Sequence, residues 1–214
     1  MKVITRVTFG NNNGEKFKVG CVIMASGLGK RFGDNKLMAD FDGQPMILRA
    51  LESTESLSKH RIVVTRHEDV ATLCRQYGVK VVLHDLPHRN DTIRLGLEAL
   101  KDVDGCMFLP ADQPLLRQQT INDLVYQWSN NQNYIIRPVC NNVPGAPVLF
   151  PKWAFQELKS LPEGKGGSFI ISKHSDCIKE IEISDPIELM DVDTPQTLET
   201  LRQYSQQKNP LRST

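Results

Sequence analysis

The stretch that decides the fold is an apolar run leading directly into a glycine-rich turn: VGCVIM at Val19–Met24, then ASGLGKRFGDNK at Ala25–Lys36. Glycines adopt backbone angles closed to other residues, so the amide N–H groups of the turn can approach an anion closely. Lys30, Arg31 and Lys36 bring positive charge to the same place. A strand followed by such a loop is suited to holding phosphates, and we therefore expect a nucleotide ligand.

The spacing of these residues excludes two better-known phosphate-binding motifs. A dinucleotide fingerprint, G-x-G-x-x-G, counted from Gly27 requires glycine where Phe32 stands. A P-loop, G-x-x-x-x-G-K-[ST], meets the same phenylalanine and lacks the Lys-Ser/Thr pair. The pattern that remains is G-x-G-x-R-x-G-x-x-K. An ordinary strand-to-helix turn with lysines facing water is the alternative, but it would not need all of these positions: Gly27, Gly29, Arg31, Gly33 and Lys36.

Length and composition narrow the class of protein. At 214 residues the chain can bury one sizeable core, and nothing in its composition marks a break into two independent domains. A formal net charge of +1 gives no global attraction to nucleic acid. The five cysteines show no C-x-x-C spacing and are expected to be reduced. Without an apolar leader or a membrane-spanning run, we expect a cytoplasmic protein with no membrane partner.

Short apolar runs alternate with amphipathic segments, which is typical of strands connected through helices to parallel neighbours. The expected strands are Val19–Met24, Arg61–Val64, Lys80–Leu83, Gly105–Leu109 and Tyr134–Val139. The expected helices are Met46–Leu57, with Pro45 near the first helical position, His67–Tyr77, Thr92–Leu100, Thr120–Trp128 and Pro195–Tyr204. The pattern predicts an α/β fold: a single-domain three-layer sandwich with a mainly parallel, Rossmann-like sheet.

Ligands of such a sheet bind outside the carboxyl ends of the strands. The glycine loop follows the first expected strand, Thr65 ends the second, Asp85 follows the third and Asp112 follows the fourth. These segments should therefore converge on one crevice.

Carboxylates in the crevice suggest a divalent cation, because Mg²⁺ often takes only one or two protein carboxylates beside substrate phosphates. Asp112 and Asp193 are the candidate ligands. Each has an alternative: Asp112 can be a turn residue between prolines, and Asp193 can be a helix-entry residue. His84 and His88 are expected to be loop histidines, since the proline between them argues against the helix that a shared zinc site would need.

The glycine loop resembles the signature segment of the MobA-like nucleotidyltransferases, and within them the molybdenum cofactor cytidylyltransferase branch. Three later segments match in the family's order. LPADQP at Leu109–Pro114 resembles its metal-binding Asp-x-Pro turn, and GAPVLF at Gly145–Phe150 its acceptor-side segment. DVDTP at Asp191–Pro195 resembles its late Asp-x-Asp-Thr-Pro element. The resemblance covers about residues 19–204 and implies a nucleotide-diphospho-sugar transferase-like fold. It gives residues 19–205 as the nucleotidyltransferase domain, after an extension of unknown role at 1–18 and before a polar tail at 206–214.

The resemblance also implies roles for individual residues. Nucleotide binding is assigned to Ala25, Ser26, Gly27, Leu28, Gly29, Lys30, Arg31, Lys36, Thr65 and Asp85. Catalysis is assigned to Arg31, Lys36 and Asp112, the metal to Asp112 and Asp193, and acceptor binding to Gly145, Pro147, Gly166 and Asp191. In the family an alanine at the position of Ser26 goes with cytosine and a glycine with guanine, so Ser26 favours CTP.

The implied reaction is transfer of CMP from CTP to a phosphorylated pterin (molybdenum) cofactor, with Mg²⁺ and release of pyrophosphate. A molybdoenzyme that receives the product is a conceivable partner. A guanylyltransferase, or an enzyme for another small phosphorylated acceptor, is the nearest alternative. From a different class comes a non-catalytic nucleotide-binding module that acts as a cofactor chaperone.

Overall fold

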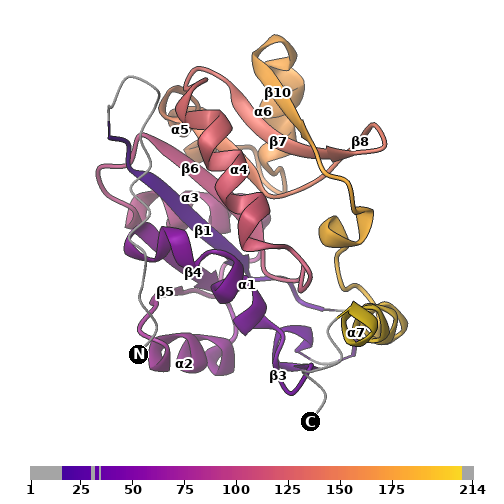
Figure 1. Cartoon of the computed structure of the whole chain (residues 1–214). Coiled ribbons are helices and arrows are strands. Elements are labelled where there is room, and N and C mark those ends of the chain that lie inside the picture. The colour runs from indigo at the N-terminus through magenta and orange to yellow at the C-terminus, as the bar shows by residue number, and fades with distance from the viewer. Residues whose placement is uncertain (1–15, 30–31, 34, 209–214) are drawn as a thin grey trace.

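An eight-stranded sheet runs through the middle of the computed structural model, which describes residues 16–29, 32–33 and 35–208 (Figure 1). Its strands follow the order β10-β7-β9-β6-β1-β4-β5, and β8 pairs with β7. The strands are β1 (Val19–Ala25), β4 (Arg61–Thr65), β5 (Lys80–Leu83), β6 (Gly105–Pro110), β7 (Ile135–Cys140), β8 (Val143–Pro144), β9 (Val148–Pro151) and β10 (Ile178–Glu182).

The sheet is mainly parallel, as predicted. β1 pairs in parallel with β4 and β6, β4 with β5, and β10 with β7. The five strands expected from the sequence are all present, with ends shifted by one residue at most. β8, β9 and β10 were not expected. β9 lies antiparallel between β6 and β7, so it is the reversed strand in the centre of the sheet.

Helices cover both faces of the sheet. They are α1 (Ile47–Ser53), α2 (Glu68–Gln76), α3 (Arg89–Ala99), α4 (Gln118–Ser129), α5 (Phe155–Lys159), α6 (Gly167–Lys173) and α7 (Pro195–Lys208). Short 3-10 turns are η1 (Lys36–Met38), η2 (Glu55–His60), η3 (Lys152–Ala154), η4 (Ser175–Cys177) and η5 (Pro186–Leu189), and β2 (Asp40–Phe41) pairs with β3 (Gln44–Pro45) in a separate hairpin.

Besides α7, which continues from the expected end at Tyr204 to Lys208, two helix predictions need correction at their ends. The helix expected over Met46–Leu57 ends at Ser53, because the Ser53 and Thr54 hydroxyls donate to the Ala50 carbonyl and compete with the helical ladder. Pro45 belongs to the hairpin strand β3 and not to the first helical turn.

The other correction concerns α3, which begins at Arg89 and not at Thr92. The His88 N–H donates to the Asp91 carboxylate at 3.3 Å, which satisfies a backbone donor ahead of the helix. The start of α3 therefore lies three residues nearer to β5, at the edge of the sheet where a ligand would bind.

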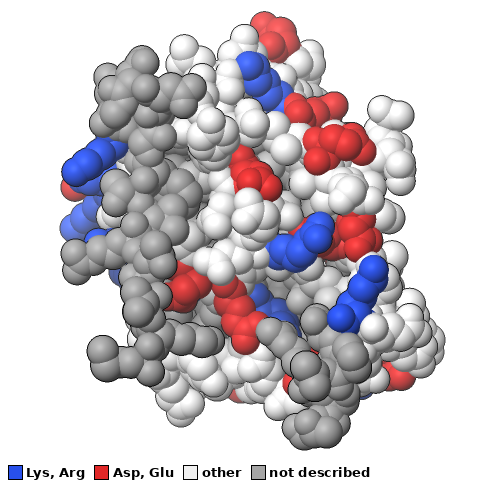
Figure 2. Space-filling view, viewed as in Figure 1, with Lys and Arg blue, Asp and Glu red and all other residues white. Residues whose placement is uncertain are grey.

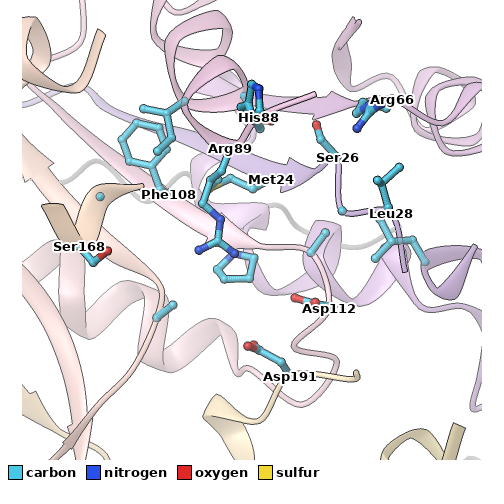
Figure 3. Close-up of a pocket in the computed structure, with 18 of the residues that line it drawn as sticks. Met24, Ser26, Leu28, Arg66, His88, Arg89, Phe108, Asp112, Ser168 and Asp191 are labelled. Atoms are coloured by element: carbon cyan, nitrogen blue, oxygen red, sulfur yellow. The ribbon is translucent and has the colours of Figure 1, made fainter. Parts of the chain in front are cut away.

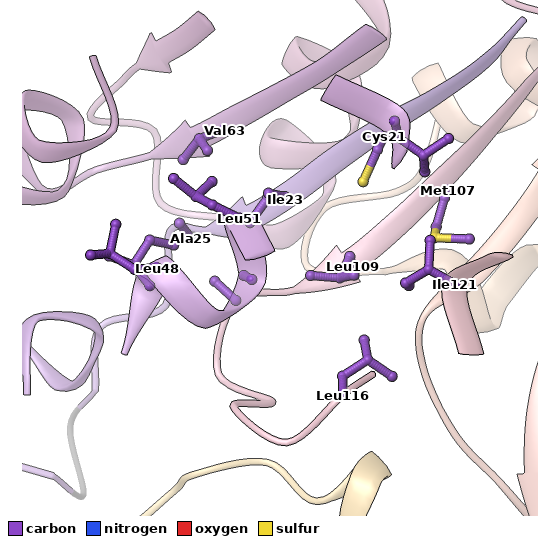
Figure 4. Close-up of a cluster of buried hydrophobic side chains, with 14 of the residues drawn as sticks. Cys21, Ile23, Ala25, Leu48, Leu51, Val63, Met107, Leu109, Leu116 and Ile121 are labelled. Carbon is purple, nitrogen blue, oxygen red and sulfur yellow. The ribbon is translucent and has the colours of Figure 1, made fainter. Parts of the chain in front are cut away.

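The core lies in two layers because side chains of a strand alternate between faces. Cys21, Ile23 and Ala25 of β1 pack toward α1 and α4, in the cluster of Figure 4. Val22 points to the opposite face and packs against α3. The three-layer prediction is thus confirmed. α3 approaches so closely that a Cβ on Gly96 would lie 2.6 Å from Val22 Cγ1.

A buried glutamate fixes the two chain segments that carry the candidate metal ligands. Glu188, in η5, accepts hydrogen bonds from the Arg117 backbone at 3.2 Å and from Arg117 Nε at 2.7 Å, and another from Thr120. Just after η5, the Val192 N–H donates to the Asp112 carbonyl at 2.8 Å. Segments 71 residues apart in the sequence are thereby held side by side.

Candidate functional site

A pocket of about 770 Å³ opens at the carboxyl edge of the parallel strands (Figure 3). Residues that follow β1, β4, β5, β6 and η5 line it. The reversed strand β9 begins at this edge, and its Val148 and Phe150 line the pocket. The structure therefore brings the expected crevice together, as the carboxyl-end rule requires.

Eight of the residues proposed from the sequence line this pocket: Ser26, Gly27, Leu28, Gly29, Lys36, Asp112, Asp191 and Asp193. Lys30 and Arg31 lie outside the described residues.

The structure places the other candidates outside the lining. Ala25 is buried within β1, and Asp85 lies exposed beyond the pocket. The buried Thr65 hydroxyl donates to the Ala25 carbonyl at 2.9 Å and accepts from the His67 N–H at 3.1 Å, so it holds neighbouring strands.

Three acceptor-side candidates border the pocket without lining it. Gly145, Pro147 and Gly166 each lie beside a residue that does line it, namely Ala146 or Gly167. Gly145 packs under Leu189, where a Cβ would approach the Leu189 side chain to 2.8 Å. The role predicted for Gly145 is therefore at least partly one of packing.

The glycine loop turns back on itself and is held by α2. Gly29 has a φ of 57°, a region that favours glycine, and its carbonyl accepts from the Phe32 N–H at 2.7 Å. The Gly27 carbonyl lies 2.8 Å from His67 Nε2. On the far side of the loop, Asn35 Nδ2 donates to both carboxylate oxygens of Asp69, each at 2.9 Å. The first turn of α2 thus anchors the loop on both sides.

Lys36 joins the candidate metal ligands into one cluster. Its ammonium lies 2.5 Å from Asp112 Oδ2, 2.8 Å from the Val192 carbonyl and 3.5 Å from Asp193 Oδ1. The side chain is only 11% exposed, so these contacts are partly shielded from water. Three oxygens from two distant segments therefore converge on a single positive charge.

This donor set fits a hard divalent cation. Carboxylate and carbonyl oxygens are the ligands that Mg²⁺ prefers, and two carboxylates are enough when substrate phosphates supply the rest. Within the described ranges, no group of three or more His, Cys, Asp or Glu residues is arranged as a complete protein cage. An ion here would need ligands from a bound substrate or water.

Asp191 lines the same pocket near Asp112 (Figure 3). Desolvation by the surrounding protein, followed by the negative charge of Asp112, raises the pKa of the Asp191 carboxyl. The sequence assigned Asp191 to the acceptor, and that assignment stays a prediction.

Ser26 has its hydroxyl fixed in place. Its Oγ donates to the Val64 carbonyl at 3.1 Å and lies 2.8 Å from His84 Nε2. The tautomer of the His84 ring decides which of these two atoms donates in that contact. Desolvation, then the Arg66 charge, lowers the pKa of His84 and favours a neutral ring. Nothing in the amino-acid pattern connects His84 with Ser26, because 58 residues separate them.

Sequence reasoning missed several lining residues. Arg66 directly follows β4. The rule that ligands bind at the carboxyl ends of parallel strands, which pointed to Thr65, points equally to this next position. Arg89 and Ser168 begin α3 and α6. An apolar wall, formed by Phe108 and Phe150 with Ile93, Val148 and Ile171, completes the pocket.

On the face shown in Figure 2, acidic and basic groups alternate, and the described residues form no continuous basic stripe there. No helix in the described part of the chain is long and apolar enough to cross a membrane.

The fold and pocket define an α/β protein with a phosphate-type glycine loop beside a carboxylate cluster. The family model of the MobA-like NTP transferase domain matches residues 21–178, which is most of the chain. The chain belongs to this family, as the resemblance predicted.

Two curated relatives show how far the likeness extends. A probable molybdenum cofactor guanylyltransferase of Bacillus cereus (strain G9842) is 28% identical over 126 residues, 56% of this chain and 61% of that protein. A 3-deoxy-manno-octulosonate cytidylyltransferase of Neisseria gonorrhoeae (strain NCCP11945) is 38% identical over 92 residues, 41% of this chain and 36% of that protein. The chain thus matches less than two thirds of the length of these relatives.

Solved structures share the fold. CMP:2-keto-3-deoxy-manno-octonic acid synthetase complexed with CTP has a TM-score of 0.75 and 17% identity, covering 89% of this chain and 99% of that one. Rv0371c of Mycobacterium tuberculosis, in complex with manganese, has a TM-score of 0.70 and 18% identity, covering 87% and 98%. At these identities the likeness confirms the nucleotide-diphospho-sugar transferase-like fold alone.

Proposed function

We propose that this protein is a nucleotidyltransferase that transfers CMP from CTP to a phosphorylated pterin cofactor and releases pyrophosphate. The observation that carries the proposal is the convergence of the glycine loop, Lys36 and the Asp112–Asp193 carboxylates on one pocket. Binding alone would not need two carboxylates beside a lysine, which disfavours a non-catalytic chaperone. The family and the names of both curated relatives support nucleotidyl transfer.

In the proposed reaction a phosphate oxygen of the acceptor attacks the α-phosphorus of CTP. A new P–O bond forms, the bond to the β-phosphate oxygen breaks, and pyrophosphate leaves with the negative charge. A phosphate nucleophile is ionised at neutral pH, so no general base is required. Lys36 would stabilise the charge that grows on the phosphates, and such a preorganised contact commonly contributes about 10²–10³ in rate.

Asp112 and Asp193 would hold the Mg²⁺ ion. When bound, the ion neutralises phosphate charge and helps to align the reacting groups. The Lys36 ammonium already contacts an oxygen of each carboxylate, which supports their ability to share a cation. The manganese complex of a structurally similar protein is consistent with a divalent ion in this fold.

Ser26 supports cytosine as the preferred base. Its hydroxyl is fixed between Val64 and His84, so the side chain occupies a constant volume at the pocket wall. That volume is one that a purine would need. Guanylyl transfer is the second candidate, because one of the two curated relatives is a probable guanylyltransferase.

The acceptor half of the pocket supports a flat acceptor over a polyhydroxylated one. Phe108 and Phe150 pack edge to face with ring centroids 5.8 Å apart, and Val148 lies on the same wall. A sugar acid would leave most of its hydroxyls facing apolar side chains, which is costly without compensating hydrogen bonds.

Ligand-dependent thermal unfolding tests the nucleotide assignment. Because a ligand that binds only the native state raises stability by mass action, CTP with Mg²⁺ should raise the melting temperature more than GTP, ATP or UTP. Ser26→Gly should reduce the difference between CTP and GTP. Pyrophosphate release in the presence of an acceptor separates an enzyme from a chaperone. A parent protein that prefers GTP would overturn the cytidylyl assignment while leaving nucleotidyl transfer in place.

A further inference from the structure

Arg89 extends its side chain into the middle of the pocket. Figure 3 shows it with Phe108 and Ser168 on one side and Asp112 and Asp191 on the other. Within the described part of the chain, Arg89 makes no hydrogen bond or ion pair. A guanidinium directed into a ligand pocket without a protein partner has its donors available for an anion.

The surrounding contacts define the direction of this side chain. Gly166 leaves the space that the Arg89 stem occupies, since a Cβ there would lie 2.8 Å from Arg89 Cδ. On either side of Arg89, His88 Nε2 lies 2.8 Å from Glu163 Oε1, and Asn90 accepts a backbone N–H of the same loop at 3.0 Å. The start of α3 is thus fastened to the loop before α6.

The other described cations that line the pocket, Lys36 and Arg66, have different neighbours. Lys36 is engaged with the carboxylates, and Arg66 lies close enough to His84 to lower its pKa. Figure 3 shows Arg89 beside Phe108, whose ring packs against that of Phe150. A planar guanidinium also matches the geometry of a phosphate, to which it can donate two parallel hydrogen bonds.

We propose that Arg89 binds the phosphate of the acceptor, while the Phe108–Phe150 wall receives an aromatic or heterocyclic body attached to that phosphate. The Ser168 hydroxyl, which lines the same end of the pocket, is a second donor for the acceptor. The proposal rests on the proposed function and adds to it a residue that selects the acceptor. It makes Arg89 a binding residue for the acceptor and not for the nucleotide.

Calorimetric binding of phenyl phosphate tests this assignment. The protein is first saturated with Mg²⁺ and an α,β-methylene analogue of CTP, so that no transfer occurs. Loss of a charge-assisted contact corresponds to roughly 10- to 100-fold in affinity, so Arg89→Gln should weaken phenyl phosphate binding by about that factor. Arg89→Lys keeps the positive charge but loses the planar guanidinium, so its affinity for phenyl phosphate should lie between those of the parent and Arg89→Gln. The matched control is Arg94→Gln on the same helix, whose side chain pairs with Asp91 and Glu98, and it should bind like the parent.

The results separate the possible outcomes. Unchanged phenyl phosphate binding in Arg89→Gln overturns the proposal. Equal weakening of the CTP analogue also overturns it, because Arg89 would then be a nucleotide ligand. Methyl phosphate binding as tightly as phenyl phosphate overturns the assignment of the apolar wall. If the parent does not bind the CTP analogue, the titration is made without it. Phenyl phosphate binding that still depends on Arg89 then supports this site while the proposed cytidylyl transfer fails.

Discussion

Replacing Lys36 by methionine should destabilise the protein in a way that Mg²⁺ repairs. Methionine keeps most of the side-chain volume but removes the ammonium that contacts Asp112, Asp193 and the Val192 carbonyl. A hydrogen bond to a charged group contributes about 1.5–3 kcal/mol, and a buried partner left unpaired costs about 1–3 kcal/mol. Because Asp112 keeps 20% exposure, water relieves part of that cost, and we expect a net loss of about 3 kcal/mol.

The corresponding change in melting temperature is measurable. For a chain of this length, 1 kcal/mol corresponds to about 2–4 °C, so Lys36→Met should melt roughly 6–12 °C below the parent. Mg²⁺ should raise the melting temperature of the variant more than that of the parent, since the ion no longer competes with the ammonium for the carboxylates.

A surface lysine provides the control. Lys80 donates to the Ala99 carbonyl at 2.8 Å without contacting a carboxylate, so Lys80→Met should lose little stability and gain nothing extra from Mg²⁺. Differential scanning fluorimetry with and without Mg²⁺ compares the three proteins. A Lys36→Met variant that melts with the control, or that responds to Mg²⁺ like the parent, would refute the idea that lysine and metal share these oxygens.

Three further predictions address other contacts. Asp112→Asn keeps the shape but loses a negative charge, so activity should require more Mg²⁺ or disappear, and a magnesium titration that overlays the parent's would reduce Asp112 to a turn residue. Glu188→Ala removes a buried carboxylate with several donors and should lower the free energy of unfolding by about 3 kcal/mol, measured by urea denaturation, with a loss below about 1 kcal/mol contradicting it. Because the folded-state pKa of His84 lies below its ordinary value of 6.5, the unfolded chain binds this proton more readily, and stability should fall as the pH drops below 6.5. In unfolding measurements from pH 5 to 8, His84→Gln should lose that part of the pH dependence. An unchanged slope of the free energy of unfolding against pH would argue against a lowered pKa of His84.

Strands β1, β4, β6 and β7 could be predicted because each is a short, largely buried run of apolar residues. β1 and β4, for example, are buried along almost their whole length and read as strands without knowledge of their neighbours. β10 escaped prediction because it is an edge strand of sequence IKEIE with alternating charge and only partial burial. The helix starting at Arg89 was placed too late, since its cap depends on a side-chain contact of Asp91 that the hydrophobic pattern does not reveal.

The residues of the candidate site also fall into those that could be predicted from the sequence and those that could not. Residues that follow a strand, such as Lys36 and Asp112, could be placed by the rule that ligands meet the carboxyl ends of parallel strands. Phe150 could not, because its place beside Phe108 depends on the insertion of β9 between β6 and β7. Arg89 does not follow a strand directly, and only the tertiary structure shows where its side chain points.

Because strand β9 runs in the reverse direction, two separate parts of the sequence form the two halves of the pocket. The glycine loop, Arg66 and Asp112 all come from the chain before α4, whereas the apolar wall gains Val148 and Phe150 only after the chain turns back from β7. One contiguous stretch, residues 135–171, therefore adds Val148, Phe150 and Ser168 to the proposed acceptor surface without contributing to the glycine loop. Substitutions confined to this block would therefore change one side of the proposed acceptor wall while leaving the glycine loop, Arg66 and Asp112 unchanged.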